Sequence, residues 1–259
     1  MSEPETPNGK YMYCIIRCYE PRQFTTMGIG ERKDIVNTVH YKDLAAVVSD
    51  SPIVEHENSR RNMMAHTLVL EEVMQEYTIL PVRFGIVAPS VKGIQEQVLE
   101  RRYDELNGLL IEMEGRVELG LKAFWYEDVY EDVIFQEIVT EDSAIRRLRD
   151  SLVGRTSEET YYERIRLGEM IESGMWRKRD EDAEKILTPL RPLVSRTIAN
   201  KVITDRMVLN AAFLVDKARM PEFDQVVNTL DQEMGKRLIF KYVGPVPPYN
   251  FVNIVVHWE

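Results

Sequence analysis

The 259 residues are enough for one large domain or two modest ones, and 44% hydrophobic with 29% charged residues is the composition of an ordinary globular protein. The net charge of −10 argues against nucleic acid as a primary partner, because an acidic surface repels phosphate groups. No run approaches the roughly 18 apolar residues of a membrane-spanning helix, and the polar, acidic start does not resemble a signal peptide. We therefore expect a cytoplasmic protein that does not associate with a lipid membrane.

The first half of the chain predicts short strands followed by helices. Residues 1–9 are expected to be a disordered tail, and residues 11–19, rich in β-branched and aromatic side chains, a strand. A loop with two glycines should lead into strands at 35–40 and 44–49, joined by a tight turn. A helix is expected over about 58–77, because His66, Leu70 and Val73 recur at helical spacing. An extended segment at 80–85 and a second helix, from a Ser90 cap to Gly115, complete this half.

The second half alternates strands with longer helices. Residues 117–125 predict a half-buried strand. Helices should follow from a Thr140 cap and from a capping box at Thr156 and Glu159, ending where Pro189 and Pro192 break the pattern. A strand at 208–215 and a helix from Pro221 to Gly235 come next, and then strands at 237–243 and 251–258.

These elements predict an α+β protein of two closely packed domains. We expect an N-terminal mixed α/β domain over residues 1–115. Residues 116–259 are close to a ferredoxin-like layout, with a helical insertion at about 140–200. The segments alone leave the strand order open.

The sequence offers no catalytic, metal or cofactor site. Cys14 and Cys18 lie four apart on the first predicted strand, about 13 Å along it, which is too far for a disulfide. None of the four histidines has the spacing of a metal pair, and there is no nucleophile elbow or phosphate loop. His66 lies on an apolar helix face, where a hydrogen-bonded core histidine is favoured over a ligand or base. We therefore predict a protein that is not an enzyme and needs no cofactor.

Two local features suggest protein interaction. Segment 80–85 places one guanidinium, Arg83, among apolar neighbours that include Phe84. Such a cation needs a partner, either an internal carboxylate, which is favoured, or a group on another molecule. Loop 244–250 has three prolines and predicts a stiff apolar projection, equally suited to a binding surface and to a rigid hairpin corner. The candidate interaction residues are Arg83, Phe84, Pro247, Pro248 and Tyr249.

Four stretches together resemble the F/L family of gas vesicle proteins over most of the chain. They are YMYCII at 11–16, HYKDLAAVVS at 40–49, the helix around His66 that leads into LPVRFG at 80–85, and GPVPPYNFV at 244–252. The resemblance implies an N-terminal domain of unusual α/β topology and a modified ferredoxin-like domain with a helical extension. It also implies an accessory role without enzymatic activity.

The resemblance implies that the partners are the small, strongly apolar gas vesicle shell protein and other accessory vesicle proteins. An acidic, soluble protein could cover the apolar face of that subunit by strand addition or by cradling an amphipathic helix. We expect the N-terminal domain to provide this surface near Arg83 and Phe84. Two alternatives stay open: an adaptor that binds only other accessory proteins, and a small-molecule-binding regulator or enzyme on a ferredoxin-like sheet.

Overall fold

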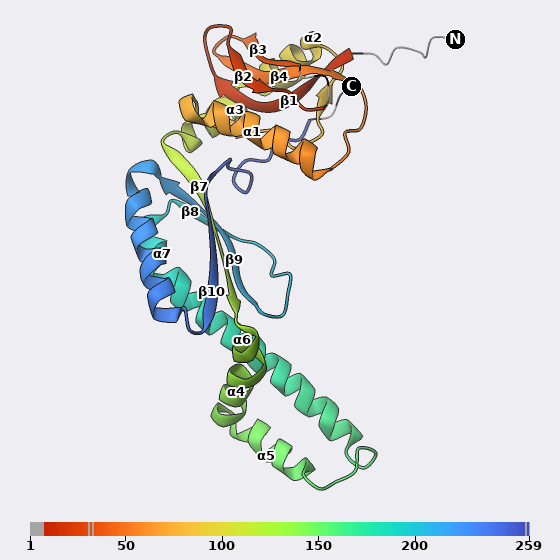
Figure 1. Ribbon diagram of the computed structural model, residues 1–259, viewed down its shortest axis with the longest axis vertical. Helices are drawn as coiled ribbons and strands as arrows, with labels where there is room; N and C mark the ends of the chain where they lie inside the picture. The colour runs from red at the N-terminus through yellow and green to blue at the C-terminus, as the bar shows by residue number, and fades with distance from the viewer. Residues whose placement is uncertain (1–7, 31, 33, 257, 259) are drawn as a thin grey trace, which may run out of the picture. The chain divides into compact units, whose positions relative to one another are not determined.

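The computed structural model describes residues 8–30, 32, 34–256 and 258 of the protein. The chain divides into two units (Figure 1). Unit 1 contains the chain up to Glu118 and again from Pro245 onward, and unit 2 is Leu119–Gly244. The division at Glu118 lies near the boundary expected at residue 115. However, the end of the chain, which the sequence places in the second domain, belongs to unit 1.

Unit 1 is built on a six-stranded sheet in the order β2-β3-β4-β1-β5, with β6 also pairing β1. The strands are β1 Asn8–Arg17, β2 Gln23–Met27, β3 Ile35–Tyr41, β4 Leu44–Pro52, β5 Ile79–Pro81 and β6 Val87–Ala88. The central strand β1 runs antiparallel to β4, β5 and β6 and is buried along most of its length. The strands expected at 35–40 and 44–49 are confirmed. Lys42 turns between them with a positive φ of 52°.

Two expectations for this sheet are wrong. Asn8 and Gly9, assigned to a disordered tail, are the first residues of β1, and the rest of that expected tail lies outside the described residues. The loop expected after the first strand contains β2. This strand escapes the pattern because it is a five-residue strand at the end of the sheet in which no side chain is fully buried. Cys14 and Cys18 are free and buried, as the spacing requires.

The helices of unit 1 follow the predicted apolar stripes. They are α1 Arg60–Glu76, α2 Val91–Gly93 and α3 Tyr103–Met113, with a π-helical segment at Ile94–Glu100. Ser59 caps α1 and Ser90 caps α2, where its hydroxyl accepts from the Gly93 amide at 3.0 Å. The inner face of α1 packs His66, Val69, Leu70 and Val73 toward the sheet.

Residues 251–256 are not the strand that their apolar side chains predict, and residue 257 of the expected strand lies outside the described residues. Phe251, Val252 and Ile254 are buried, but among residues 251–256 and 258 the backbone makes a single isolated parallel bridge, from Val82 to Ile254. Residues 247–256 form what we call the C-terminal strap. The carboxylate of Glu118 holds this strap by accepting from the Asn250 amide at 2.9 Å and from its side chain at 2.5 Å.

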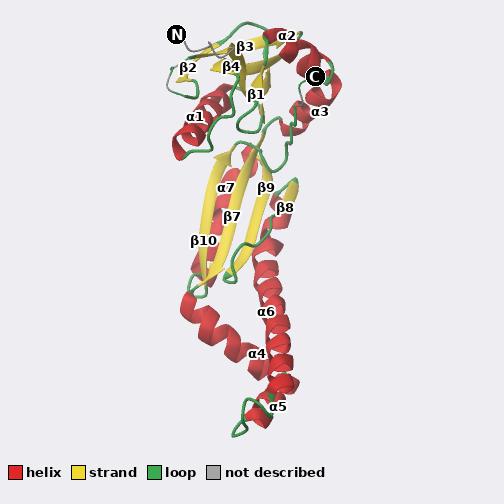
Figure 2. Ribbon diagram, turned by 90° about the vertical axis from the view of Figure 1, so that its right-hand side faces the viewer, coloured by secondary structure: helices red, strands yellow, loops and turns green. Residues whose placement is uncertain are grey.

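Unit 2 has a four-stranded sheet in the order β10-β7-β9-β8 (Figure 2). Its strands are β7 Arg116–Trp125, β8 Arg196–Ala199, β9 Met207–Asp216 and β10 Leu238–Val246. Its α-helices are α4 Phe135–Glu141, α5 Ser143–Leu152, α6 Tyr161–Leu190 and α7 Met220–Met234, with a π-helical segment at Val129–Ile134 and 3-10 turns at Arg191–Leu193 and Lys217–Arg219. The Trp125 indole donates to Asp182 of α6, and Phe213 packs on Phe223 of α7, so α6 and α7 contact the same sheet.

Three predicted details of unit 2 are wrong. Asp142, not Thr140, caps α5, because its carboxylate accepts from the amides of Ala144 and Ile145. Pro189 lies inside α6, since a proline one residue from the end of a 30-residue helix removes a single backbone hydrogen bond. The last strand extends to Val246 through Pro245. Because β10 is at the sheet edge, a missing donor is tolerated there.

Candidate functional site

His66 of α1 is the centre of a buried aromatic cluster in unit 1. Its Nδ1 lies 3.0 Å from the Tyr11 hydroxyl and its Nε2 lies 2.8 Å from the Tyr249 hydroxyl. The Phe84 ring packs against it edge-on at 5.8 Å, and the Tyr13 ring lies at 5.5 Å. The histidine is only 1% exposed. One side chain therefore joins strand β1, helix α1, segment 80–85 and the C-terminal strap.

The cluster is electrically neutral near pH 7. Burial lowers the pKa of His66 to about 4, and burial raises the pKa of the Tyr11 and Tyr249 phenols above their ordinary range. The Gly85 amide donates to the Tyr11 oxygen at 3.0 Å. A neutral imidazole donates from one nitrogen and accepts at the other, so it bonds both phenols in either tautomer. The arrangement satisfies every polar atom of the ring and serves as a clamp between segments.

The structure brings the two predicted interaction segments together at this histidine. Phe84 is half-buried, and Tyr249, although its hydroxyl reaches His66, is 41% exposed. Pro247 and Pro248 are buried rather than projecting. The sequence singled out His66 as a core histidine, which the structure confirms. It missed Tyr11 and Glu118 as partners, because only the fold places them beside the strap.

Arg83 differs from the favoured expectation of an internal carboxylate. Its side chain is exposed, and it makes no ion pair with any carboxylate in the described part of the chain. Arg83 lies two residues after the end of β5 and immediately before Phe84. It is thus a charged group at the surface beside the histidine cluster.

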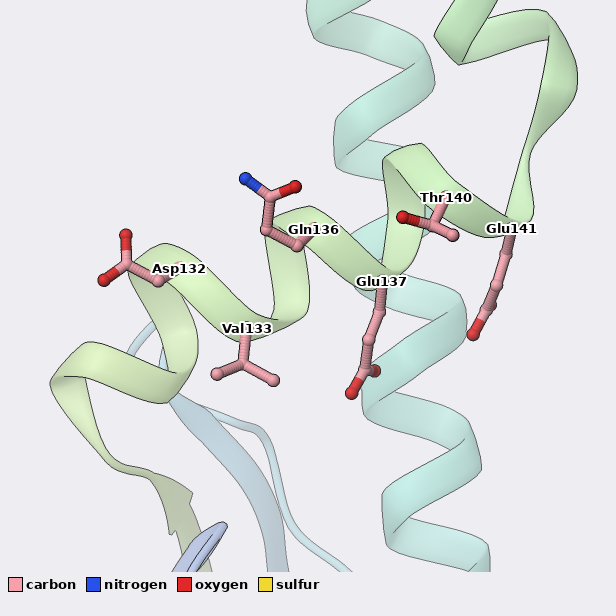
Figure 3. Close-up of a pocket in the computed structure, with 6 residues that line it drawn as sticks. All are labelled: Asp132, Val133, Gln136, Glu137, Thr140 and Glu141. Carbon is pink, nitrogen blue, oxygen red and sulfur yellow. The ribbon is translucent and has the colours of Figure 1, made fainter.

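A concave feature lies in unit 2, on the side of α4 and the preceding π-helical segment (Figure 3). The hollow has a volume of about 450 Å³, and it is lined by Asp132, Val133, Gln136, Glu137, Thr140 and Glu141. Val133, Glu137 and Glu141 project to the same side of the helix (Figure 3).

Two of the carboxylates that line this hollow are already paired. Lys178 contacts Glu141 at 2.5 Å and Glu137 at 3.4 Å, and Arg237 binds Glu137 through two nitrogens. The Arg237 guanidinium holds the pKa of Glu137 below its usual range. The sequence missed this network because its members are far apart in the chain, with a separation of 37 positions between Glu141 and Lys178 and of 100 between Glu137 and Arg237. These carboxylates and cations form a fixed cluster of ion pairs.

The described residues include no group of three or more His, Cys, Asp and Glu side chains placed to hold a metal ion. No helix in the described part of the chain combines the length and the apolar character that crossing a membrane requires.

Comparison with known proteins identifies relatives along nearly the whole chain. The family model described as gas vesicle synthesis protein GvpL/GvpF matches residues 9–253. Gas vesicle protein F of Microcystis aeruginosa is 30% identical over 199 residues, which cover 76% of this chain and 79% of that protein. Gas vesicle protein F of Nostoc sp. is 27% identical and covers 95% of this chain and 99% of the relative.

Solved structures agree in fold as well as in sequence. The crystal structure of the gas vesicle protein GvpF from Anabaena sp. matches with a TM-score of 0.83 and 27% identity, covering 96% of this chain and all of that one. The match confirms a mixed α+β protein with two sheets. By its sequence and by its fold, this chain belongs to the gas vesicle synthesis protein GvpL/GvpF family and is a gas vesicle accessory protein.

Proposed function

We propose that this protein binds the gas vesicle shell protein during vesicle assembly, in the cytoplasm and without enzymatic activity or a cofactor. The observation that carries the proposal is the exposed Arg83 guanidinium, which has no carboxylate partner among the described residues. Phe84 and Tyr249 flank the same histidine cluster and are partly accessible. A cation next to accessible aromatic side chains suits a protein surface that carries both apolar and acidic groups.

The edge strand β2 is a poor site for strand addition. The carboxylate of Glu72 on α1 accepts from the Thr25 and Thr26 amides, both at 2.8 Å. Burial raises the pKa of Glu72, but the hydrogen bonds from the side chains and amides of Thr25 and Thr26 outweigh it and lower the pKa to about 2. Two amides of this edge are thus occupied, which favours binding through side chains over main-chain pairing.

We also infer that the two units are separate domains, and that unit 2 is a modified ferredoxin-like domain with α4, α5 and the first part of α6 as its helical extension. The strand order β10-β7-β9-β8 supports this inference, as does the presence of helices after β7 and after β9. That order is the one in which two β-α-β units interleave around a central pair of strands.

Co-expression with the small shell subunit tests the function. We expect the tagged chain to recover shell protein from the soluble fraction, and Arg83→Ala to reduce recovery severalfold because the exposed cation is lost. Lys92→Ala is the matched control, since Lys92 is an exposed cation on α2 of the same unit. Circular dichroism and thermal unfolding of each variant establish that it is folded.

Three results would count against the proposal. Equal recovery with Arg83→Ala and wild type would remove this region from the interface. An equal loss of shell-protein recovery with Lys92→Ala would mean that the net charge of the chain, and not the position of Arg83, causes the loss. If the shell protein stays insoluble while the chain is folded, direct binding fails. An adaptor that binds only other accessory proteins then becomes the better account.

A further inference from the structure

The outer face of α6 in unit 2 carries apolar and aromatic side chains that its own unit leaves exposed. Tyr162 is 81% exposed, Trp176 49% and Ile165 45%. Helical spacing places these side chains on one side of α6, over about 21 Å at 1.5 Å per residue. We call this face the outer stripe and define it as Tyr162, Ile165, Gly168, Glu169, Glu172 and Trp176.

The opposite side of α6 makes the contacts within unit 2. Gly174 faces Ile138 of α4, and Lys178 is buried against Glu141 of the same helix. Figures 1 and 2 show α4 and α5 alongside α6. Tyr162 and Ile165 are therefore exposed beyond the packing of this unit, whereas the Trp176 ring is partly covered by the Arg179 guanidinium, which lies 4.3 Å from the ring centroid.

Gly168 lies midway along the length of the stripe, where the absence of a side chain allows another backbone to approach α6 closely. A Cβ built on Gly168 would meet no atom within 4 Å, whereas one built on Gly174 would meet Ile138 at 2.6 Å. A glycine inside a helix lowers the stability of that helix relative to alanine, and packing within the unit does not require one at position 168. The free space above it admits the backbone of a second helix.

The negative charge of the stripe indicates the chemistry of its partner. Glu169 and Glu172 lie at the centre of the stripe, and their carboxylates form no ion pair with any residue that the structure describes. An antiparallel second copy of this chain would place these acids against the same acids, which is unfavourable. A helix with Lys or Arg at its centre would neutralise them.

We propose that the outer stripe docks an amphipathic helix of another protein. The partner helix carries basic side chains opposite Glu169 and Glu172, and aliphatic side chains toward Tyr162 and Trp176 at the two ends. Gly168 lets the two backbones approach. This site is in unit 2 and is independent of the shell-protein surface proposed on unit 1.

Fluorescence anisotropy with the full chain tests the proposal. The probe is a labelled amphipathic peptide of about 21 residues, with leucines along one face and two central lysines on that face. A matched peptide has glutamates in place of the two lysines. We expect the lysine peptide to bind at least about tenfold more tightly, and Glu169→Lys with Glu172→Lys to reverse the order of the two peptides. Asp231→Lys with Glu233→Lys on α7, an equal change of charge outside the stripe, should leave the order unchanged.

Substitutions at Gly168 distinguish an effect on docking from an effect on folding. Gly168→Ala should raise the melting temperature of the free chain, and Gly168→Leu should weaken the lysine peptide about tenfold while the fold is retained. The proposal is overturned if both peptides bind equally, or if neither binds. It is also overturned if Gly168→Leu binds like wild type. Self-association of the chain that Tyr162→Ser abolishes would identify a second copy as the occupant and would likewise overturn it.

Discussion

At the scale of single residues, His66 shows how burial sets a protonation state. The ring bonds two phenols, is 1% exposed, and has its pKa lowered to about 4 by burial. In the unfolded chain the same imidazole takes up a proton near pH 6.5. Between these values the unfolded state binds more protons than the folded state, so stability falls as the pH falls.

We predict that acidification destabilises the protein through this residue. Between pH 7 and pH 4, His66 should contribute a loss of about 3 kcal/mol in the free energy of unfolding. Urea unfolding of wild type and His66→Gln across this range is the measurement. The variant should be less stable at pH 7 but should lose less on acidification. His56, whose pKa burial also lowers, is present in both proteins and cancels. Parallel pH profiles would contradict the prediction.

At the scale of elements, α6 contains two glycines in opposite environments. Gly174 is buried where α6 crosses α4, and Gly168 is open. Alanine at 168 should stabilise the chain by about 0.5–1 kcal/mol, because it favours the helix and meets no atom. Alanine at 174 should destabilise it by about 1–3 kcal/mol, because its methyl group would overlap Ile138. Denaturant midpoints of the two variants test this, and a shift of the same sign in both would refute it.

The C-terminal strap stabilises unit 1 through side chains rather than backbone pairing. Ile254 is fully buried, while its neighbour Val255 is 39% exposed. We therefore expect Ile254→Ser to lower the free energy of unfolding by about 3 kcal/mol, and Val255→Ser to change it by less than about 1 kcal/mol. Hydrogen exchange of the β1 and β5 amides should rise only in the first variant. Comparable effects of the two substitutions would mean that the strap is held loosely.

At the scale of the whole molecule, unit 1 is completed by the far end of the chain. Fragment 1–118 lacks the strap and should melt below the full chain. A synthetic peptide spanning 245–258 should raise its melting temperature by several degrees, since a ligand of the folded state stabilises it by mass action. Calorimetry of the fragment with and without peptide tests this, with a peptide carrying Ile254→Ser as the control. A melting temperature that the peptide leaves unchanged would show that the strap does not stabilise fragment 1–118.

Much of the fold was predictable because local patterns and burial agree. The stripe on α1, the turn at Lys42 and the Ser90 cap depend on neighbours in sequence, so composition and spacing indicate them. Strand β2 and the path of residues 251–256 were not predictable in this way. One is a short edge strand, and the other has buried apolar side chains without a strand partner along most of its length.

The sequence by itself determined the family, the α+β class, the free cysteines and the buried state of His66, because each rests on residue types at short spacing. Only the tertiary structure decided the partners of His66, the pairing of Glu118 with Asn250 and the exposure of Arg83. Tyr11, His66 and Tyr249 span most of the chain, and no periodicity specifies which distant segments meet. The hydrogen bonds to the buried His66 ring depend on which distant segments come together. The exposure of the outer stripe of α6 depends on this as well.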